Sequence, residues 1–272
     1  MQGRSSFVLV AMFFGYAFLY LPIVLLIVFS FNDSRIPTVW NGFSFRWYTA
    51  LLENEQVLEA AGLSLRIAFV SATAATVLGT LAGIALNQMG RFRGRLLFAG
   101  LIAAPLVMPE VITGLSLLLL FITSEQAIGW PLSRGELTIT IAHITFSMAF
   151  VAVIVQSRLV TLDQSMLEAA LDLGAHPFRV TLDVTLPLIA PALLAGWLLA
   201  FTLSLDDLVI ASFVSGPGAS TLPMVIFSKV RLGVAPDINA LATLVITVVG
   251  LGVLLAGFVM SRRERLRGSH KD

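Results

Sequence analysis

Six long apolar segments dominate this sequence and constrain its fold more than any other feature. A helix needs about 20 apolar residues to cross the hydrocarbon core of a bilayer, and only 12% of the chain is charged. The sequence therefore predicts an all-α membrane protein, with one transmembrane domain over residues 1–272. Its six transmembrane helices are expected at about 7–31, 62–87, 96–123, 137–157, 188–214 and 237–260.

The Lys and Arg residues of the connectors predict the orientation of these helices. Short cytoplasmic loops carry an excess of both residue types, and eleven of the 17 lie on the same side as the two termini. Both termini are therefore expected in the cytoplasm. The first apolar segment is longer than the core of a secretory signal, so we expect it to be retained as a span.

The connector at 158–187 is too long for a simple turn and lies on the predicted cytoplasmic side. Ser165 and Glu168 have the three-residue spacing of a capping box, which predicts the start of a helix. Ala169 and Ala170 favour that helix and add little side-chain bulk. The resulting smooth face could dock into a groove on a partner, or the helix could lie on the lipid headgroups.

The same connector also contains signals that end the helix. Gly174 can adopt the left-handed conformation found after helix C-termini, and Pro177 prevents the helix from resuming. A second short amphipathic stretch is expected at 178–184, before the fifth span begins.

The residues of this connector resemble a known signature. Glu168-Ala169-Ala170, Gly174 and Val184-Thr185-Leu186-Pro187 match the EAA loop of binding-protein-dependent ABC importer permeases, E-A-A-x3-G-x9-I-x-L-P. Val184 in place of Ile is the one departure. The stretches 104–121 and 196–223 are similar to the permeases of polyamine ABC importers, and most similar to the putrescine type.

That resemblance implies a permease subunit of the type I fold in the bacterial inner membrane, working by alternating access. It also implies a complex with a second, homologous permease, two cytoplasmic ATPase subunits and a periplasmic polyamine-binding protein. The EAA loop would be the coupling helix that contacts an ATPase, a role that falls on Glu168, Ala169, Ala170 and Gly174. The chain has no G-x-x-x-x-G-K-[ST] motif of its own, so ATP and Mg²⁺ are expected only at the partners.

Four titratable residues inside the predicted spans are candidates for a substrate pathway: Glu110, His143, Asp206 and Asp207. An Asp at the centre of a transmembrane helix costs roughly 2.5–3.5 kcal/mol, so such residues mark a function or a buried partner. A rise of about 1.5 Å per residue places all four in the outer half of the membrane. No Lys or Arg lies deep enough to neutralise them, so we expect a pathway that attracts cations such as a diamine.

Asp206 and Asp207 cannot both face the same cavity, because adjacent helical residues point about 100° apart. Asp206 shares a helix face with Thr202 and Val209 and is the preferred substrate contact. Asp207 is expected to bond to the partner permease or to a loop backbone. An alternative is that one or both acids cap the outer end of the span.

Alternatives also exist for the other polar positions in the spans. Glu110 could bond to Thr113 or to backbone groups freed by nearby prolines, and His143 could be a satisfied contact between helices. Gly79 and Gly83 form a G-x-x-x-G pattern, which predicts close packing of the second span against another helix.

Two other functions compete with an ABC permease. A secondary transporter could use Glu110 or Asp206 as a proton site, but it would not need the capped cytoplasmic helix. A membrane enzyme is disfavoured because the sequence lacks D-D-x-x-D, G-x-G-D, H-E-x-x-H and G-x-S-x-G. The chain has no cysteine, and we expect no bound metal or cofactor.

Overall fold

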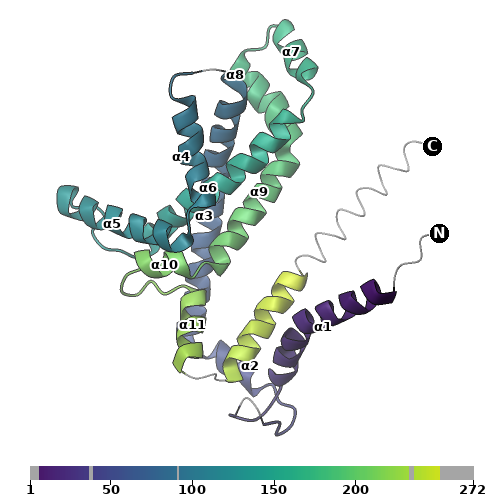
Figure 1. Ribbon diagram of the computed structural model, residues 1–272. Helices are drawn as coiled ribbons and strands as arrows, with labels where there is room; N and C mark the ends of the chain where they lie inside the picture. The colour runs from purple at the N-terminus through teal and green to yellow at the C-terminus, as the bar shows by residue number, and fades with distance from the viewer. Residues whose placement is uncertain (1–5, 37–38, 91, 233–235, 252–272) are drawn as a thin grey trace. The chain divides into compact units, whose positions relative to one another are not determined.

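A computed structural model describes residues 6–36, 39–90, 92–232 and 236–251, and every regular element in these ranges is a helix (Figure 1). The chain divides into two compact units, residues 1–58 with 226–272 and residues 59–225. Some of the basic residues on which the predicted orientation rests lie outside the described ranges. They are Arg4, Arg91 and the basic residues from Arg262 onward.

Within the described ranges, five helices are long and apolar enough to cross a membrane. They confirm the helices predicted at 7–31, 62–87 and 137–157 and modify the third and fifth. The five are Val8–Phe29 in α1 (Ser6–Phe29), α3 (Glu55–Gln88), α5 (Glu110–Ile128), α6 (Glu136–Val160) and the continuous segment Pro177–Asp206.

The prediction of one continuous helix over 96–123 was wrong. The structure has α4 (Arg95–Val107), a break, and then α5. Met108 is extended, with ψ 135°, and Pro109 lies at the N-cap of α5. A residue before proline is disfavoured in the α conformation, which accounts for the break. The predicted depth of Glu110 in the membrane assumed a continuous helix, and that estimate is therefore wrong.

The fifth span begins earlier and ends earlier than the predicted 188–214. It runs through α8 (Pro177–Val180), a π-helical turn (Thr181–Thr185) and α9 (Leu186–Asp206). A separate short helix, α10 (Val209–Val214), follows. Asp207 between them is extended, with φ −67° and ψ 123°. Because the helix is broken, Val209 does not continue the face of Asp206 as predicted.

The sixth predicted span, 237–260, is described only in part. A helix covers Pro236–Leu251, and the remainder lies outside the described ranges. It is preceded by α11 (Leu222–Leu232).

Helix α6 is central to the packing of residues 59–225, because α4, α9 and α10 all contact it. Ile139 and Phe146 of α6 lie in one hydrophobic cluster with Phe121 of α5 and Ile210 of α10. Further along α6, Val151 lies in a second cluster, with Ile189 and Ala200 of α9 among its members. One helix therefore supports both the long α9 and the short α10.

The close packing predicted from the G-x-x-x-G pattern is confirmed. A Cβ atom on Gly79 would lie 2.8 Å from the backbone oxygen of Met148 and from Cβ of Val151, both in α6. A Cβ atom on Gly83 would lie 2.9 Å from Val155 of the same helix. The two glycines let the backbones of α3 and α6 approach more closely than any larger residue would allow.

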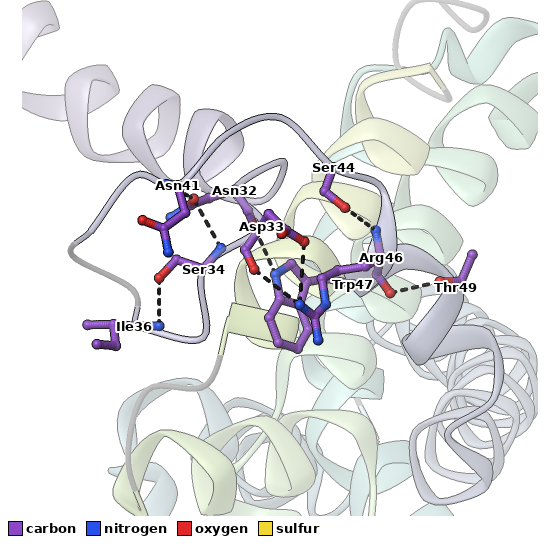
Figure 2. A network of polar contacts seen from close by, with 9 residues as sticks. All are labelled: Asn32, Asp33, Ser34, Ile36, Asn41, Ser44, Arg46, Trp47 and Thr49. Atoms are coloured by element: carbon purple, nitrogen blue, oxygen red, sulfur yellow. Dashed lines mark hydrogen bonds and ion pairs between the residues drawn. The ribbon is translucent and has the colours of Figure 1, made fainter.

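In the other unit, a polar network orders the connector between α1 and α2 (Arg46–Leu52), as Figure 2 shows. The buried Asn32 accepts hydrogen bonds from the backbone N–H groups of Ser34 and Asn41, at 3.2 and 2.9 Å. The indole N–H of Trp47 donates to the backbone oxygen of Asn32 at 2.7 Å. A single amide side chain thus organises the connector that follows the first span.

We expect Gly79→Ala to destabilise the protein by about 1–3 kcal/mol, the usual cost of overpacking a close contact. The matched control is Gly62→Ala in the same helix, where a Cβ atom meets nothing within 4 Å. Both substitutions gain the same helix propensity, so the difference between them isolates the contact with α6. Thermal unfolding in detergent measures it, and equal midpoints for the two variants would contradict the packing.

Candidate functional site

The break between α9 and α10 places the two adjacent aspartates in different environments. The Asp207 carboxylate accepts hydrogen bonds from the backbone N–H groups of Ile210 at 3.2 Å and Ala211 at 2.7 Å. These N–H groups lie in the first turn of α10 and have no intrahelical partner of their own. Asp207 therefore caps the start of α10, which supports the alternative of a capping acid rather than the preferred bond to the partner permease or a loop backbone.

His143 of α6 holds the same carboxylate from the other side. Its Nε2 atom lies 3.0 Å from Oδ2 of Asp207, and its Nδ1 atom lies 2.6 Å from the hydroxyl of Ser204. The side chains of His143 and Asp207 are 2% and 8% exposed. The alternative that His143 is a satisfied contact between helices is confirmed.

Asp206 and Glu110 differ from this buried pair, because both side chains are exposed. Within the described ranges, no other residue donates a hydrogen bond to either carboxylate or forms an ion pair with it. Glu110 is the first residue of α5, where the partial positive charge of a helix N-terminus favours a carboxylate. The alternative in which Thr113 bonds to Glu110 finds no support, since the Thr113 hydroxyl faces the backbone oxygen of Pro109.

Helices α5 and α10 pack directly against each other just beyond these acids. A Cβ atom on Gly114 would lie 2.8 Å from the ring of Phe213 and 3.3 Å from Cα of Ile210. Gly114 lies one turn after Glu110, and Ile210 lies four residues after Asp206. The helices that follow the two breaks are therefore in direct contact.

The helix predicted in the connector at 158–187 is present as α7 (Gln164–Asp172). Its N-cap is Asp163, whose carboxylate accepts from the backbone N–H of Ser165 at 3.0 Å, so the predicted capping box beginning at Ser165 was wrong. The hydroxyl and backbone N–H of Ser165 hold the pKa of Asp163 below its ordinary value of 3.8. Asp is as good an N-cap residue as Ser, and it lies two residues earlier in the chain.

The C-terminus of α7 follows the prediction. Gly174 has φ +82°, and its N–H donates to the backbone oxygen of Leu171 at 2.8 Å. The N–H of Ala175 donates to the backbone oxygen of Ala170 at 3.2 Å. This pair of bonds is the Schellman motif, which requires the left-handed residue that glycine provides. Pro177 then begins α8.

Cavities lie on two sides of α7 and involve all four predicted coupling positions or their immediate neighbours. One, of about 370 Å³, includes Glu168 together with Asn87 and Gln88 at the end of α3. The other, of about 400 Å³, includes Ala170 and Gly174. Glu168 and Ala169 are exposed, and Ala170 is half-buried. The helix therefore presents a small-residue face flanked by hollows that side chains of a partner could fill.

The sequence interpretation missed Ser204 and the break after Asp207. A signal for this break existed in the sequence. An Asp inside an apolar run can accept hydrogen bonds from the N–H groups three and four residues later and so begin a new helix. The second break lies at Pro109, one of the prolines expected to free backbone groups near Glu110, although the span itself was predicted as continuous.

Comparison with known families decides the class of this protein. Residues 75–265 match the family model described as binding-protein-dependent transport system inner membrane component. The chain belongs to this family.

Members of the family with high sequence identity are transport permeases. The chain is 58% identical over 264 residues to the putrescine transport system permease protein PotI of Escherichia coli K12, covering 97% of this chain and 94% of PotI. It is 43% identical over 258 residues to the spermidine/putrescine transport system permease protein PotC of the same strain, covering 94% of each. The family and the apolar helices identify the chain as a multi-pass inner-membrane permease component.

Solved structures agree on the fold. A chain of a bacterial ABC transporter involved in import of the acidic polysaccharide alginate superposes with a TM-score of 0.71 at 17% identity, over 96% of this chain and 98% of that one. A chain of the bacterial alginate transporter in complex with its pentasaccharide-bound periplasmic protein gives the same TM-score over 95% of this chain and 93% of that one. The fold is therefore that of an ABC importer permease.

We expect Asp163→Ala to speed amide hydrogen exchange in α7 by about two- to thirtyfold, the range that loss of an N-cap produces. Asp172→Ala, at the exposed end of the same helix, is the control and should leave exchange unchanged. The lowered pKa of Asp163 means that its contribution is present at neutral pH and is lost as the pH falls through that lowered pKa. Identical exchange in both variants would show that α7 does not depend on this cap.

Proposed function

We propose that this chain is a permease subunit of an ATP-driven importer for polyamines of the putrescine type. The observation that carries this proposal is the 58% identity to a putrescine permease over 97% of the chain. The exposed carboxylates at two helix breaks support it, because a diamine carries two ammonium groups and needs negative partners.

The proposed topology has six spans, with both termini in the cytoplasm, and treats residues 1–272 as one permease domain. The eleven-to-six distribution of Lys and Arg favours this orientation. The helix Pro236–Leu251 would be the described part of the sixth span. The coupling helix α7 would then lie on the cytoplasmic side.

The proposed complex contains a second, homologous permease, two ATPase subunits and a periplasmic polyamine-binding protein. A solved importer of the same fold contains a substrate-loaded periplasmic protein, which supports a partner of this kind. ATP and Mg²⁺ would be held by the ATPase subunits, since this chain lacks a phosphate-binding loop. The chain itself would bind no cofactor or metal.

In the proposed mechanism, the loaded binding protein docks on the outer connectors and releases its amine into the pathway. Closure of the ATPases pushes α7 through Glu168, Ala169, Ala170 and Gly174, and the spans reorient by alternating access. Glu110 and Asp206 would contact the ammonium groups in transit, while the buried Asp207 and His143 would support the helix break next to Asp206. Simple charge pairing gives a loose site, which suits cargo that must leave again.

The competing function is a secondary, proton-coupled amine transporter. It would use Glu110 or Asp206 as a proton site and would work without partners. It does not account for a capped helix that matches the EAA loop at every position but Val184.

Reconstitution of the intact complex in proteoliposomes tests the proposal. Uptake of labelled putrescine should require both ATP and the amine-loaded binding protein, and ATP hydrolysis should rise when that protein is added. Uptake that persists without the ATPase subunits would favour the secondary transporter. If ATP hydrolysis rises only with a binding protein loaded with another amine, the chain is still an importer subunit, but its cargo is that amine and not putrescine.

We expect Asp206→Asn to lower putrescine uptake about tenfold while the complex still assembles, since the variant removes the charge that offsets an ammonium group. Glu110→Gln should have a similar effect. Glu53→Gln is the control, because Glu53 is an exposed acid at the C-cap of α2, outside the candidate spans. Uptake at the wild-type rate in Asp206→Asn would remove this residue from the pathway.

A further inference from the structure

Four polar side chains form a continuous series of hydrogen bonds within residues 59–225. The hydroxyl of Ser71 in α3 lies 3.1 Å from that of Ser204 in α9. Ser204 lies 2.6 Å from Nδ1 of His143, and Nε2 of His143 lies 3.0 Å from Asp207. Ser71, Ser204 and His143 are 0%, 6% and 2% exposed. This series, Ser71–Ser204–His143–Asp207, is called the serine–histidine series below.

The chemistry of the carboxylate fixes which group donates to Asp207. An ionised carboxylate can only accept, so Nε2 of His143 carries the hydrogen that it donates to Asp207. In a neutral ring Nδ1 then accepts from the Ser204 hydroxyl, whose oxygen accepts from Ser71. If Nδ1 donates as well, Ser204 donates to Ser71, and the Ser71 hydroxyl donates to the backbone oxygen of Ala68 at 3.3 Å. The series is therefore satisfied in both directions, and the donation from Nε2 to Asp207 is common to both.

The series ends on the group that stabilises the break. Asp207 divides its two oxygens among the N–H groups of Ile210 and Ala211 and the ring of His143. Oδ2 receives both the His143 and the Ala211 hydrogens, so the ring determines how the carboxylate is oriented toward α10. Because α3, α6 and α9 all contribute, the break is tied to three long helices at one point.

We propose that His143 is a positioning residue for cargo transfer. Through Asp207 it holds the break after α9 in the conformation that leaves the adjacent Asp206 exposed and unpaired. His143 does not itself contact the amine, because its ring is buried and both its nitrogens are occupied. This inference rests on the proposed function, since it assigns the buried histidine a task in the same pathway.

A role in packing alone makes a different prediction from a role in positioning. The ring fills volume in either case, but only positioning needs a side chain that bonds to Ser204 and Asp207 together. His143→Phe keeps an aromatic ring and removes both hydrogen bonds. His143→Gln keeps one amide donor and one acceptor in a smaller side chain. The two variants therefore separate hydrogen bonding from the filling of space.

The experiment measures putrescine moved per ATP hydrolysed by the complete complex in proteoliposomes, with the amine-loaded binding protein outside. We expect His143→Phe to lower this ratio about tenfold, because a buried carboxylate oxygen loses one of its two partners. His143→Gln should retain at least about half of the wild-type ratio, because its amide can replace both bonds. Stimulation of ATP hydrolysis by the binding protein should persist in both variants.

A wild-type ratio in His143→Phe would overturn the inference, and so would a greater loss in His143→Gln than in His143→Phe. If His143→Phe does not assemble, Ser204→Ala decides, because it removes the donor to Nδ1 with little change in volume. A wild-type ratio in that variant would also overturn the inference. Failure of the wild-type complex to move putrescine would instead refute the proposed function.

Discussion

A backbone N–H group inside a bilayer has no water to bond, so every interruption of a transmembrane helix needs a substitute partner. In this protein the substitute after α9 is the carboxylate of Asp207, which bonds to the N–H groups of Ile210 and Ala211. Without it, the first turn of α10 would be unsatisfied at a cost of about 1–3 kcal/mol for each unpaired group. The separate α10, its packing against α5 and the exposure of Asp206 all depend on this one capped break.

The same break would be of little use if the surrounding helices could shift. Close contacts limit such movement, because α6 packs against α3 through Gly79 and Gly83 and against α9 through Gly196. Where backbones approach this closely, a helix cannot rotate without a clash. The hydrogen bonds of His143 then act between elements that are already held at fixed spacing. Packing sets the distances, and the polar contacts select one orientation of the carboxylate.

Much of the fold could be predicted from the sequence, because long apolar runs and helix-ending residues act locally. The helix at 164–172, its left-handed glycine at 174 and the close contact at Gly79 required only neighbouring residues to be recognised. The breaks were harder, since apolar periodicity continues through Pro109 and Asp207 without interruption. The hydrogen bond between His143 and Asp207 joins residues 64 positions apart. A local sequence pattern cannot predict which polar groups from distant parts of the chain will be in contact. Individual acids could be identified from the sequence, but their division into buried and exposed could not.

That division resolves a conflict between two requirements of a cation pathway. A carboxylate that holds structure must be satisfied permanently, whereas a carboxylate that attracts cargo must remain free to bind and release it. One acid cannot meet both requirements, because each hydrogen bond that the protein donates to a carboxylate weakens the attraction of that carboxylate for a cation. Adjacent aspartates meet both when the chain turns between them, since the extended Asp207 directs its carboxylate inward while Asp206 ends the helix outside. In the proposed pathway Asp207 is then the structural acid and Asp206 the substrate contact, and the helix break they share makes them different.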